Sequence, residues 1–119
     1  MRVTPEFAQS FAASWYAAWN AHDLDAIMRH YHAAIEHSSP FIKRYEGTDE
    51  VALVGIERVR AYFGRALERN PTLAFNPKHV GVGLESVILV YTRMTGDLAC
   101  EVFFFDDAGR IVRSVSHYG

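Results

Sequence analysis

The sequence predicts an α+β fold. Two observations predict it: apolar residues recur at helical spacing in the first half, and the second half holds long apolar runs separated by short turns. Helices followed by a meander of strands are typical of this class. The 119 residues contain no internal repeat, low-complexity tract or Gly/Ser linker, so we expect a single domain over residues 1–119.

The first half of the chain should form three helices. Thr4 followed by Pro5 is an N-cap and a first-turn proline. The helix that they begin has an aromatic face with one residue every four positions: Phe7, Phe11, Trp15 and Trp19. The sequence "NAHD" interrupts it, and Asp23 caps a short second helix that extends to Tyr31. A third helix fits residues 56–69, with its apolar positions on one side.

The expected strands lie mostly in the second half. A short strand fits residues 33–39 before Pro40, and residues 41–54 are interpreted as a loop. The sequences "TGD" and "DDAG" predict hairpin turns, in which Gly96 and Gly109 supply a positive φ. These turns divide the second half into four expected strands: residues 73–83, 85–95, 98–106 and 110–118.

The strand that contains the sequence "ACEVFFF" is apolar on both faces. The two faces are Glu101, Phe103 and Phe105 on one side and Cys100, Val102 and Phe104 on the other. Three helices can cover only one face of such a sheet, so we expect the outer face to bind a second copy in a symmetric homodimer. A buried carboxylate is costly unless it is paired or protonated, which makes Glu101 the main clue to function.

Composition excludes several classes of partner. The net charge is −2 and the Lys and Arg residues are scattered, so no nucleic-acid surface is expected. Cys100 is the only cysteine, which precludes an intrachain disulfide and favours a reducing cytoplasm. The N-terminus lacks the apolar segment of a signal peptide, and no stretch is apolar enough to span a bilayer. We therefore expect neither export nor a membrane partner.

No motif predicts a metal or a cofactor. His30 and His32 are two residues apart at an expected helix end. His22 and His79 fall in expected turns, and no cysteine or carboxylate completes a ligand set. The sequence "GVG" has neither the spacing nor the following helix of a phosphate-binding loop. Cys100 should face away from any pocket and no G-x-S-x-G motif is present, so no covalent nucleophile is indicated.

Four segments of the chain resemble the nuclear transport factor 2-like superfamily, and in particular its SnoaL-like branch. They are "WNAHDLDAIMRHY", "SSPF", "GIERVRAYFGRAL" and "FDDAGRIVRSVSHY". The resemblance covers nearly the whole chain. It implies three helices packed on a strongly curved mixed sheet, which together form a cone with a deep apolar pocket. It also implies dimerisation through the outer sheet face, which is common in the superfamily.

The ketosteroid isomerases, distant members of this superfamily, offer a comparison of functional positions. The resemblance places Glu101 where these enzymes have a protonated aspartic acid that holds an enolate oxygen. It places Ser39 at the position of their aspartate base and Trp15 at that of their oxyanion-hole tyrosine. A serine and an indole cannot supply those two groups, so two of the three are missing and this activity is not expected.

The same resemblance also implies which side chains line the pocket. Glu101 and His37 form the candidate catalytic acid/base pair, because burial raises the pKa of a carboxyl and an imidazole titrates near neutrality. Alternatively, Glu101 makes a structural hydrogen bond to His37, to Tyr118 or to a serine. A slip of the last strand by one residue would exchange Tyr118 for His117. The expected ligand-binding residues are Trp15, Trp19, Tyr31, Ser39, Phe63, Phe103 and Tyr118.

Two functions agree with such a pocket. The first is proton-transfer catalysis without a cofactor on a small, largely apolar molecule, by an isomerase, a cyclase or a dehydratase. The second is non-catalytic binding of the same kind of molecule, which requires no matched acid and base. Sequence alone does not identify the ligand.

Overall fold

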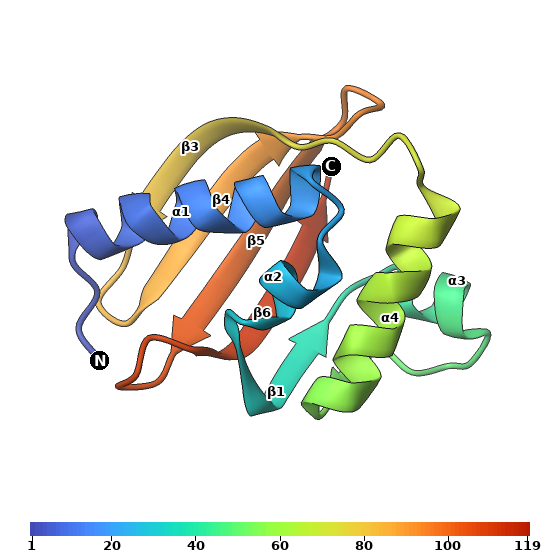
Figure 1. Ribbon diagram of the computed structural model, residues 1–119, viewed down its shortest axis with the longest axis horizontal. Coiled ribbons are helices and arrows are strands. Elements are labelled where there is room, and N and C mark those ends of the chain that lie inside the picture. The colour runs from blue at the N-terminus through green and yellow to red at the C-terminus, as the bar shows by residue number, and fades with distance from the viewer.

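The structure is a computed structural model that describes residues 1–119 and contains four helices and six strands (Figure 1). The helices are α1 (Pro5–Asn20), α2 (Leu24–Met28), α3 (Ile42–Glu46) and α4 (Ile56–Arg69). The strands are β1 (Tyr31–Ser38), β2 (Ala52–Val54), β3 (Asn76–Val82), β4 (Ser86–Thr92), β5 (Leu98–Phe105) and β6 (Ile111–Tyr118). None of the helices combines the length and the apolarity that a bilayer crossing requires.

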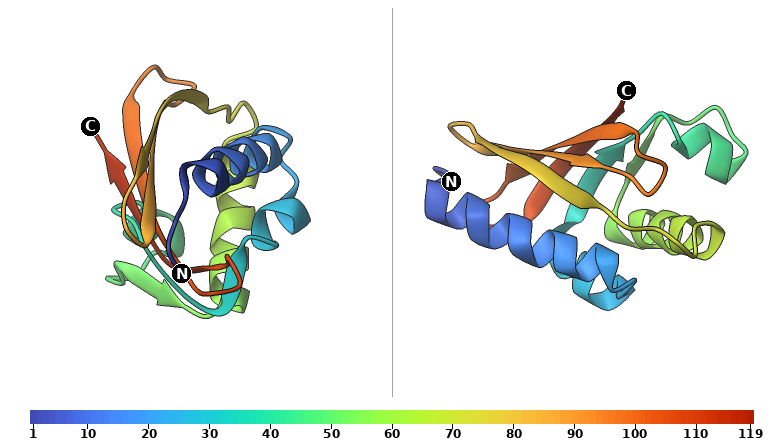
Figure 2. Two further views of the ribbon diagram at one scale, coloured as in Figure 1. Left: turned by 90° about the vertical axis from the view of Figure 1, so that its left-hand side faces the viewer. Right: turned by 90° about the horizontal axis from the view of Figure 1, so that it is seen from above.

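The six strands form one mixed sheet in the order β2-β1-β6-β5-β4-β3. Strands β1 and β6 are parallel, and all other neighbours are antiparallel. Figure 2 shows that the sheet curves around α1, α2 and α4, which lie along one of its faces, and that no helix covers the other face of β4 and β5. The α+β fold with helices on a curved mixed sheet is therefore confirmed.

The predicted helix starts are also confirmed. The backbone N–H of Phe7 donates to Thr4 Oγ1 over 3.1 Å, and that of Ala26 donates to Asp23 Oδ1 over 3.1 Å. Each side chain satisfies one of the N–H groups that a helix leaves free at its start. Helix α4 has the predicted bounds, and its apolar side packs on the sheet through residues such as Val59 and Phe63.

The interpretation of residues 41–54 as a loop was wrong, because this segment contains α3 and β2. Helix α3 has five residues and β2 has three, so neither is long enough to show a periodic pattern. Strand β2 forms through pairing with β1, in which His37 lies opposite Leu53. The molecule thus has one helix and one strand more than the sequence predicted.

Two further assignments need correction. Tyr31 was expected at the end of the second helix, but it begins β1, where it pairs with Ile111 of β6. Long-range pairing therefore overrides the local helical pattern at this position. His79 was expected in a turn and lies within β3, opposite Val90. Its side chain is exposed, so no burial pattern marked this edge strand in the sequence.

The central hairpins determine where Glu101 lies. Gly96 and Gly109 have φ values of 87° and 78°, as the two turns require. The resulting register pairs Glu101 with Leu89 of β4 and with Ser116 of β6. Alternate residues of β5 on the Glu101 side are buried under the helices, whereas those on the Val102 side are only half-buried. Glu101 consequently occupies the middle of the covered face.

Candidate functional site

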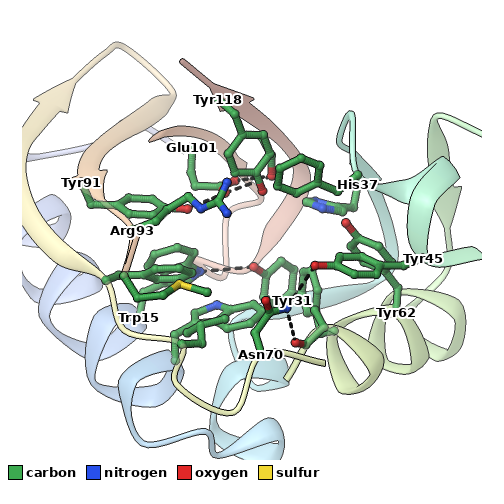
Figure 3. Close-up of a pocket in the computed structure, with 18 residues that line it drawn as sticks. Trp15, Tyr31, His37, Tyr45, Tyr62, Asn70, Tyr91, Arg93, Glu101 and Tyr118 are labelled. Carbon is green, nitrogen blue, oxygen red and sulfur yellow. Dashed lines mark hydrogen bonds between the residues drawn. The ribbon is translucent and has the colours of Figure 1, made fainter. Parts of the chain in front are cut away.

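A pocket opens between the covered face of the sheet and the helices α1 and α4 (Figure 3). Eighteen residues line it, and thirteen of them are hydrophobic. The cavity volume is about 70 Å³. This composition, apolar with a few polar groups, is typical of small-molecule sites. The lining is apolar because the aromatic face of α1 meets the buried face of β5 at the pocket.

Glu101 lies on the sheet side of this pocket and is bound by two hydroxyl groups. Tyr91 Oη donates to Glu101 Oε1 over 3.0 Å. Ser116 Oγ lies 3.0 Å from Oε1 and 2.8 Å from Oε2, within hydrogen-bonding distance of both carboxyl oxygens. Tyr91 and Ser116 come from the strands on either side of β5, so the sheet register itself builds this group.

The environment of Glu101 favours its protonated form. The side chain is 6% exposed, and burial raises its pKa to about 7, although the hydrogen bonds from Ser116 and Tyr91 act in the opposite direction. No arginine or lysine pairs with it. A carboxyl that is neutral part of the time at pH 7 can donate a hydrogen bond or a proton to a bound molecule.

His37 lies on β1 and also lines the pocket. It is 4% exposed, and burial lowers its pKa to about 4, so the imidazole is neutral at pH 7. Its Nδ1 lies 2.7 Å from Ser114 Oγ, and its ring packs edge-on against Phe63. Nε2 makes no hydrogen bond within the chain. Figure 3 shows His37, Tyr118 and Glu101 along the same side of the pocket.

Aromatic side chains form the opposite wall. Trp15 Nε1 donates to the hydroxyl of Tyr31 over 3.3 Å, which joins α1 to β1 at the base of the pocket. Trp19 packs against Phe63, with ring centroids 5.0 Å apart. The Trp19 Nε1 donor is fully buried and has no hydrogen-bond partner. All four of these predicted residues line the pocket.

Two of the predicted ligand-binding residues do not line the pocket. Phe103 lies farther along β5, where its ring meets Phe11 at 4.9 Å and Trp15 at 5.4 Å in the hydrophobic core. Ser39 is buried at the end of β1, and its Oγ accepts from the backbone N–H of Phe41 over 3.2 Å. Its hydroxyl therefore stabilises the turn into α3.

The pocket mouth is formed by half-buried aromatic residues and one cation. Tyr118, and not His117, faces the pocket, and its ring stacks on Phe41 with centroids 4.2 Å apart. The guanidinium of Arg93 lies 5.2 Å from the centroid of each of these rings. Met94, beside Arg93, is 37% exposed. Burial also raises the pKa of the Tyr118 hydroxyl, which stays neutral.

A comparison with models of protein families identifies the family of this chain. The model of the SnoaL-like domain matches residues 12–114. The chain belongs to the SnoaL-like family. A SnoaL-like protein of unknown function from Burkholderia thailandensis is 43% identical to it over 98% of each chain, with a TM-score of 0.91. None of the curated proteins matches the chain.

More distant solved structures share the fold of this SnoaL-like protein. A proposed polyketide cyclase from Sinorhizobium meliloti is 13% identical and has a TM-score of 0.74, with 96% of this chain and 95% of that chain covered. A nuclear transport factor 2-like protein of unknown function from Cytophaga hutchinsonii is 13% identical with a TM-score of 0.71, covering 100% and 93% of the two chains. The superfamily resemblance seen in the sequence is therefore confirmed.

Several residues of the SnoaL-like pocket were missed by sequence reasoning. Tyr91, which binds Glu101, belongs to the predicted hairpin. The turn near Gly96 places both residues on one face, so their contact could have been predicted from the sequence. Phe41 and Tyr45 fell in the segment interpreted as a loop. Arg93 lies just after β4 but within the predicted strand 85–95, where alternation places it on the same face as Tyr91.

The remaining polar groups offer no metal-ligand set. No group of three or more His, Cys, Asp or Glu side chains lies close enough to hold a metal ion. Asn70, at the end of α4, uses its Nδ2 to donate to Tyr45 Oη over 3.0 Å and to the carbonyl of Ala66 over 2.7 Å. This pair of bonds holds α3 against α4 beside the pocket mouth.

Proposed function

We propose that this protein binds a small, largely apolar molecule in the pocket and transfers a proton on it without a cofactor. The observation that carries the proposal is Glu101, a carboxyl with a pKa near 7 that lines an aromatic pocket. The reaction would be of the isomerase, cyclase or dehydratase type. The structural similarity to a proposed polyketide cyclase supports the fold of such an enzyme and not its substrate.

In this proposal the chain supplies both proton-transfer groups. Protonated Glu101 donates its O–H to an oxygen of the ligand and stabilises the negative charge that develops there. Tyr91 and Ser116 keep the carboxyl oriented. His37 Nε2 accepts a proton from an adjacent carbon when Nδ1 carries the ring proton and donates to Ser114. The aromatic walls exclude water from the reacting atoms.

The alternative is non-catalytic binding in the same pocket. One observation favours it: the pKa of His37 is lowered to about 4, which makes this imidazole a weak base. A binding protein needs only the apolar walls and a few oriented polar groups, and the pocket has both.

We also propose the reducing cytoplasm as the compartment of this protein, on the basis of the single unpaired Cys100.

Deuterium exchange of a small apolar ketone tests the two functions. The probe is 2-tetralone in D₂O, whose exchangeable α-protons are followed by NMR, with binding measured by tryptophan fluorescence. The wild-type protein should accelerate exchange, and Glu101→Gln should lower the rate about 100-fold while affinity changes only a few-fold, because the amide keeps the shape. Glu36→Gln, an equivalent change at an exposed position on β1, should leave exchange unaltered.

The outcomes separate the proposals. Binding of 2-tetralone without accelerated exchange supports the non-catalytic alternative. Exchange that survives Glu101→Gln unchanged removes Glu101 from the mechanism. Absence of binding at millimolar concentration contradicts both functions.

A further inference from the structure

The pocket contains one cation that has no anionic partner. Arg93 is half-buried, and it is the only lysine or arginine among the residues that line the pocket. The ion pairs of the other arginines lie outside the pocket and involve Arg58, Arg60, Arg65 and Arg113. The side chain of Arg93 makes no hydrogen bond within the chain. Its five donors are therefore free.

The aromatic mouth fixes the position of this cation. The Arg93 guanidinium lies 5.2 Å from the ring centroids of both Phe41 and Tyr118, which stack on each other. Cation–π contact with two rings orients the guanidinium and removes part of its hydration. An oriented and partly dehydrated guanidinium is a ready partner for a carboxylate.

Glu101 does not fill this role. Its oxygens bind Tyr91 and Ser116, and no oxygen of Glu101 lies within ion-pair distance of Arg93. Burial also raises the pKa of this carboxyl to about 7, so below neutral pH it carries little negative charge. The charge on Arg93 is thus left without compensation by the protein.

A second polar group of the pocket also lacks a partner. Trp19 Nε1 is a buried donor without an acceptor, and the Trp19 side chain is only 6% exposed. An unsatisfied buried N–H costs free energy, but this nitrogen has no accessible surface, so a molecule in the pocket contacts the Trp19 ring and not its N–H. Trp19 belongs to the aromatic wall with Phe63 and Phe75. Arg93 is therefore the group of the pocket that favours a negatively charged ligand.

We propose that the ligand is a flat, largely apolar organic anion whose carboxylate or enolate oxygens bind Arg93 at the pocket mouth. Its hydrocarbon part lies between the aromatic walls, which include the Trp19 ring. This inference rests on the proposed function only in its premise that the pocket holds a small apolar molecule. It names the chemical class of that molecule and requires no catalysis.

A matched pair of probes tests the proposal. 2-Naphthoate and 2-naphthamide have nearly the same shape, and at pH 6, where Glu101 is mostly protonated, only the first carries a charge. Isothermal titration calorimetry should show that the wild-type protein binds the naphthoate about ten-fold more tightly, in agreement with one charge-assisted contact. The preference should fall as salt is added, because the pocket mouth is partly open to solvent.

Two variants assign the preference to Arg93. Arg93→Gln should bind both probes with about equal affinity, since it loses the charge and keeps a polar side chain. Arg44→Gln is the matched control: Arg44 also lies over the Phe41 ring, at 5.1 Å, but does not line the pocket. It should keep the preference for the acid.

Each result bears on the inference in a distinct way. Equal affinity of the wild-type protein for the two probes overturns the selection of an anion, although binding of the amide would leave the proposed function intact. A preference that persists in Arg93→Gln overturns the assignment to Arg93. If neither probe binds at millimolar concentration, both the inference and its premise fail.

Discussion

At the scale of single residues, the pocket holds two buried titratable groups with opposite shifts. The pKa of Glu101 is raised from 4.5 to about 7, and that of His37 is lowered from 6.5 to about 4, in both cases by burial. Both shifts favour the neutral form, because the apolar pocket solvates charge poorly. Each makes the folding free energy depend on pH, with opposite sign.

Replacement of Glu101 by glutamine should stabilise the protein at alkaline pH. Folded Glu101 keeps a proton that the unfolded chain releases above pH 4.5, so its contribution is complete below pH 4.5 and is lost as the pH rises through 7. Glu101→Gln has no such loss, and its stability relative to wild type should increase by about 3 kcal/mol between pH 4.5 and 8. Urea unfolding at several pH values measures this difference. A difference that does not vary with pH would contradict a buried, protonated Glu101.

His37 should show the reverse behaviour. The unfolded chain takes up a proton on this imidazole below pH 6.5 and the folded protein does not, so its contribution is present above pH 6.5 and is lost as the pH falls through 4. His37→Asn, which keeps a polar atom near Ser114, should therefore gain stability relative to wild type between pH 6.5 and 4. In the wild-type protein the pH-dependent contributions of Glu101 and His37 to stability nearly cancel. The two variants measure each contribution separately.

At the scale of elements, a side chain at the end of α1 holds one wall of the pocket. Asn20 Nδ2 donates to the carbonyl of Phe75 over 3.0 Å, and the Phe75 backbone N–H donates to Asn20 Oδ1 over 2.7 Å. This reciprocal pair imitates a strand pairing and connects α1 to the chain that enters β3. The Phe75 ring in turn stacks on Trp15, with centroids 5.6 Å apart.

Loss of this connection should affect both stability and binding. Asn20→Ala removes both hydrogen bonds and should lower the free energy of unfolding by about 1–2 kcal/mol. It should also weaken the binding of 2-naphthoate, because Phe75 is no longer held against the pocket. Ser10→Ala, at an exposed position on the same helix, is the control and should change neither quantity. Unfolding and calorimetric titration measure the two effects, and unchanged affinity in Asn20→Ala would show that Phe75 is held by packing alone.

At the scale of the whole molecule, the uncovered face of the sheet is a candidate interface. Its centre is apolar and half-buried in a single chain, and consists of Ile88, Val90, Cys100, Val102, Phe104 and Val115. Contiguous apolar surface of this kind marks an interaction site. We propose that two copies pack these faces together in a symmetric dimer, as the sequence predicted.

A charge at the centre of this face should separate the dimer. Light scattering after size-exclusion chromatography should give a dimer for the wild-type protein at micromolar concentration. Val102→Lys should give a monomer with unchanged far-ultraviolet circular dichroism, because the substitution buries a charge only in the dimer. Leu84→Lys, in the exposed turn between β3 and β4, should remain dimeric. A monomeric wild-type protein would refute the proposed interface.

Much of the fold follows from local patterns in the sequence. The caps at Thr4 and Asp23, the spacing of the aromatic residues of α1 and the turns at Gly96 and Gly109 act within a few residues of chain. They specify the long helices and the central hairpins wherever they occur. The sequence of β5, apolar on both faces, specified a buried strand, and the family resemblance placed Glu101 on the face that lines the pocket.

Tertiary structure alone decided how the pocket is completed. Tyr31 became a strand residue and β2 formed because other segments paired with them, and such pairing leaves no periodic signal in a short segment. The same long-range packing sent Phe103 into the core and brought Arg93 to the pocket mouth. The sequence by itself therefore determined the α+β fold and the buried carboxyl, since these depend on local propensity and on an apolar run that must be buried. The set of groups around that carboxyl depends on the curvature of the sheet and on loops, which exist only once the chain has folded.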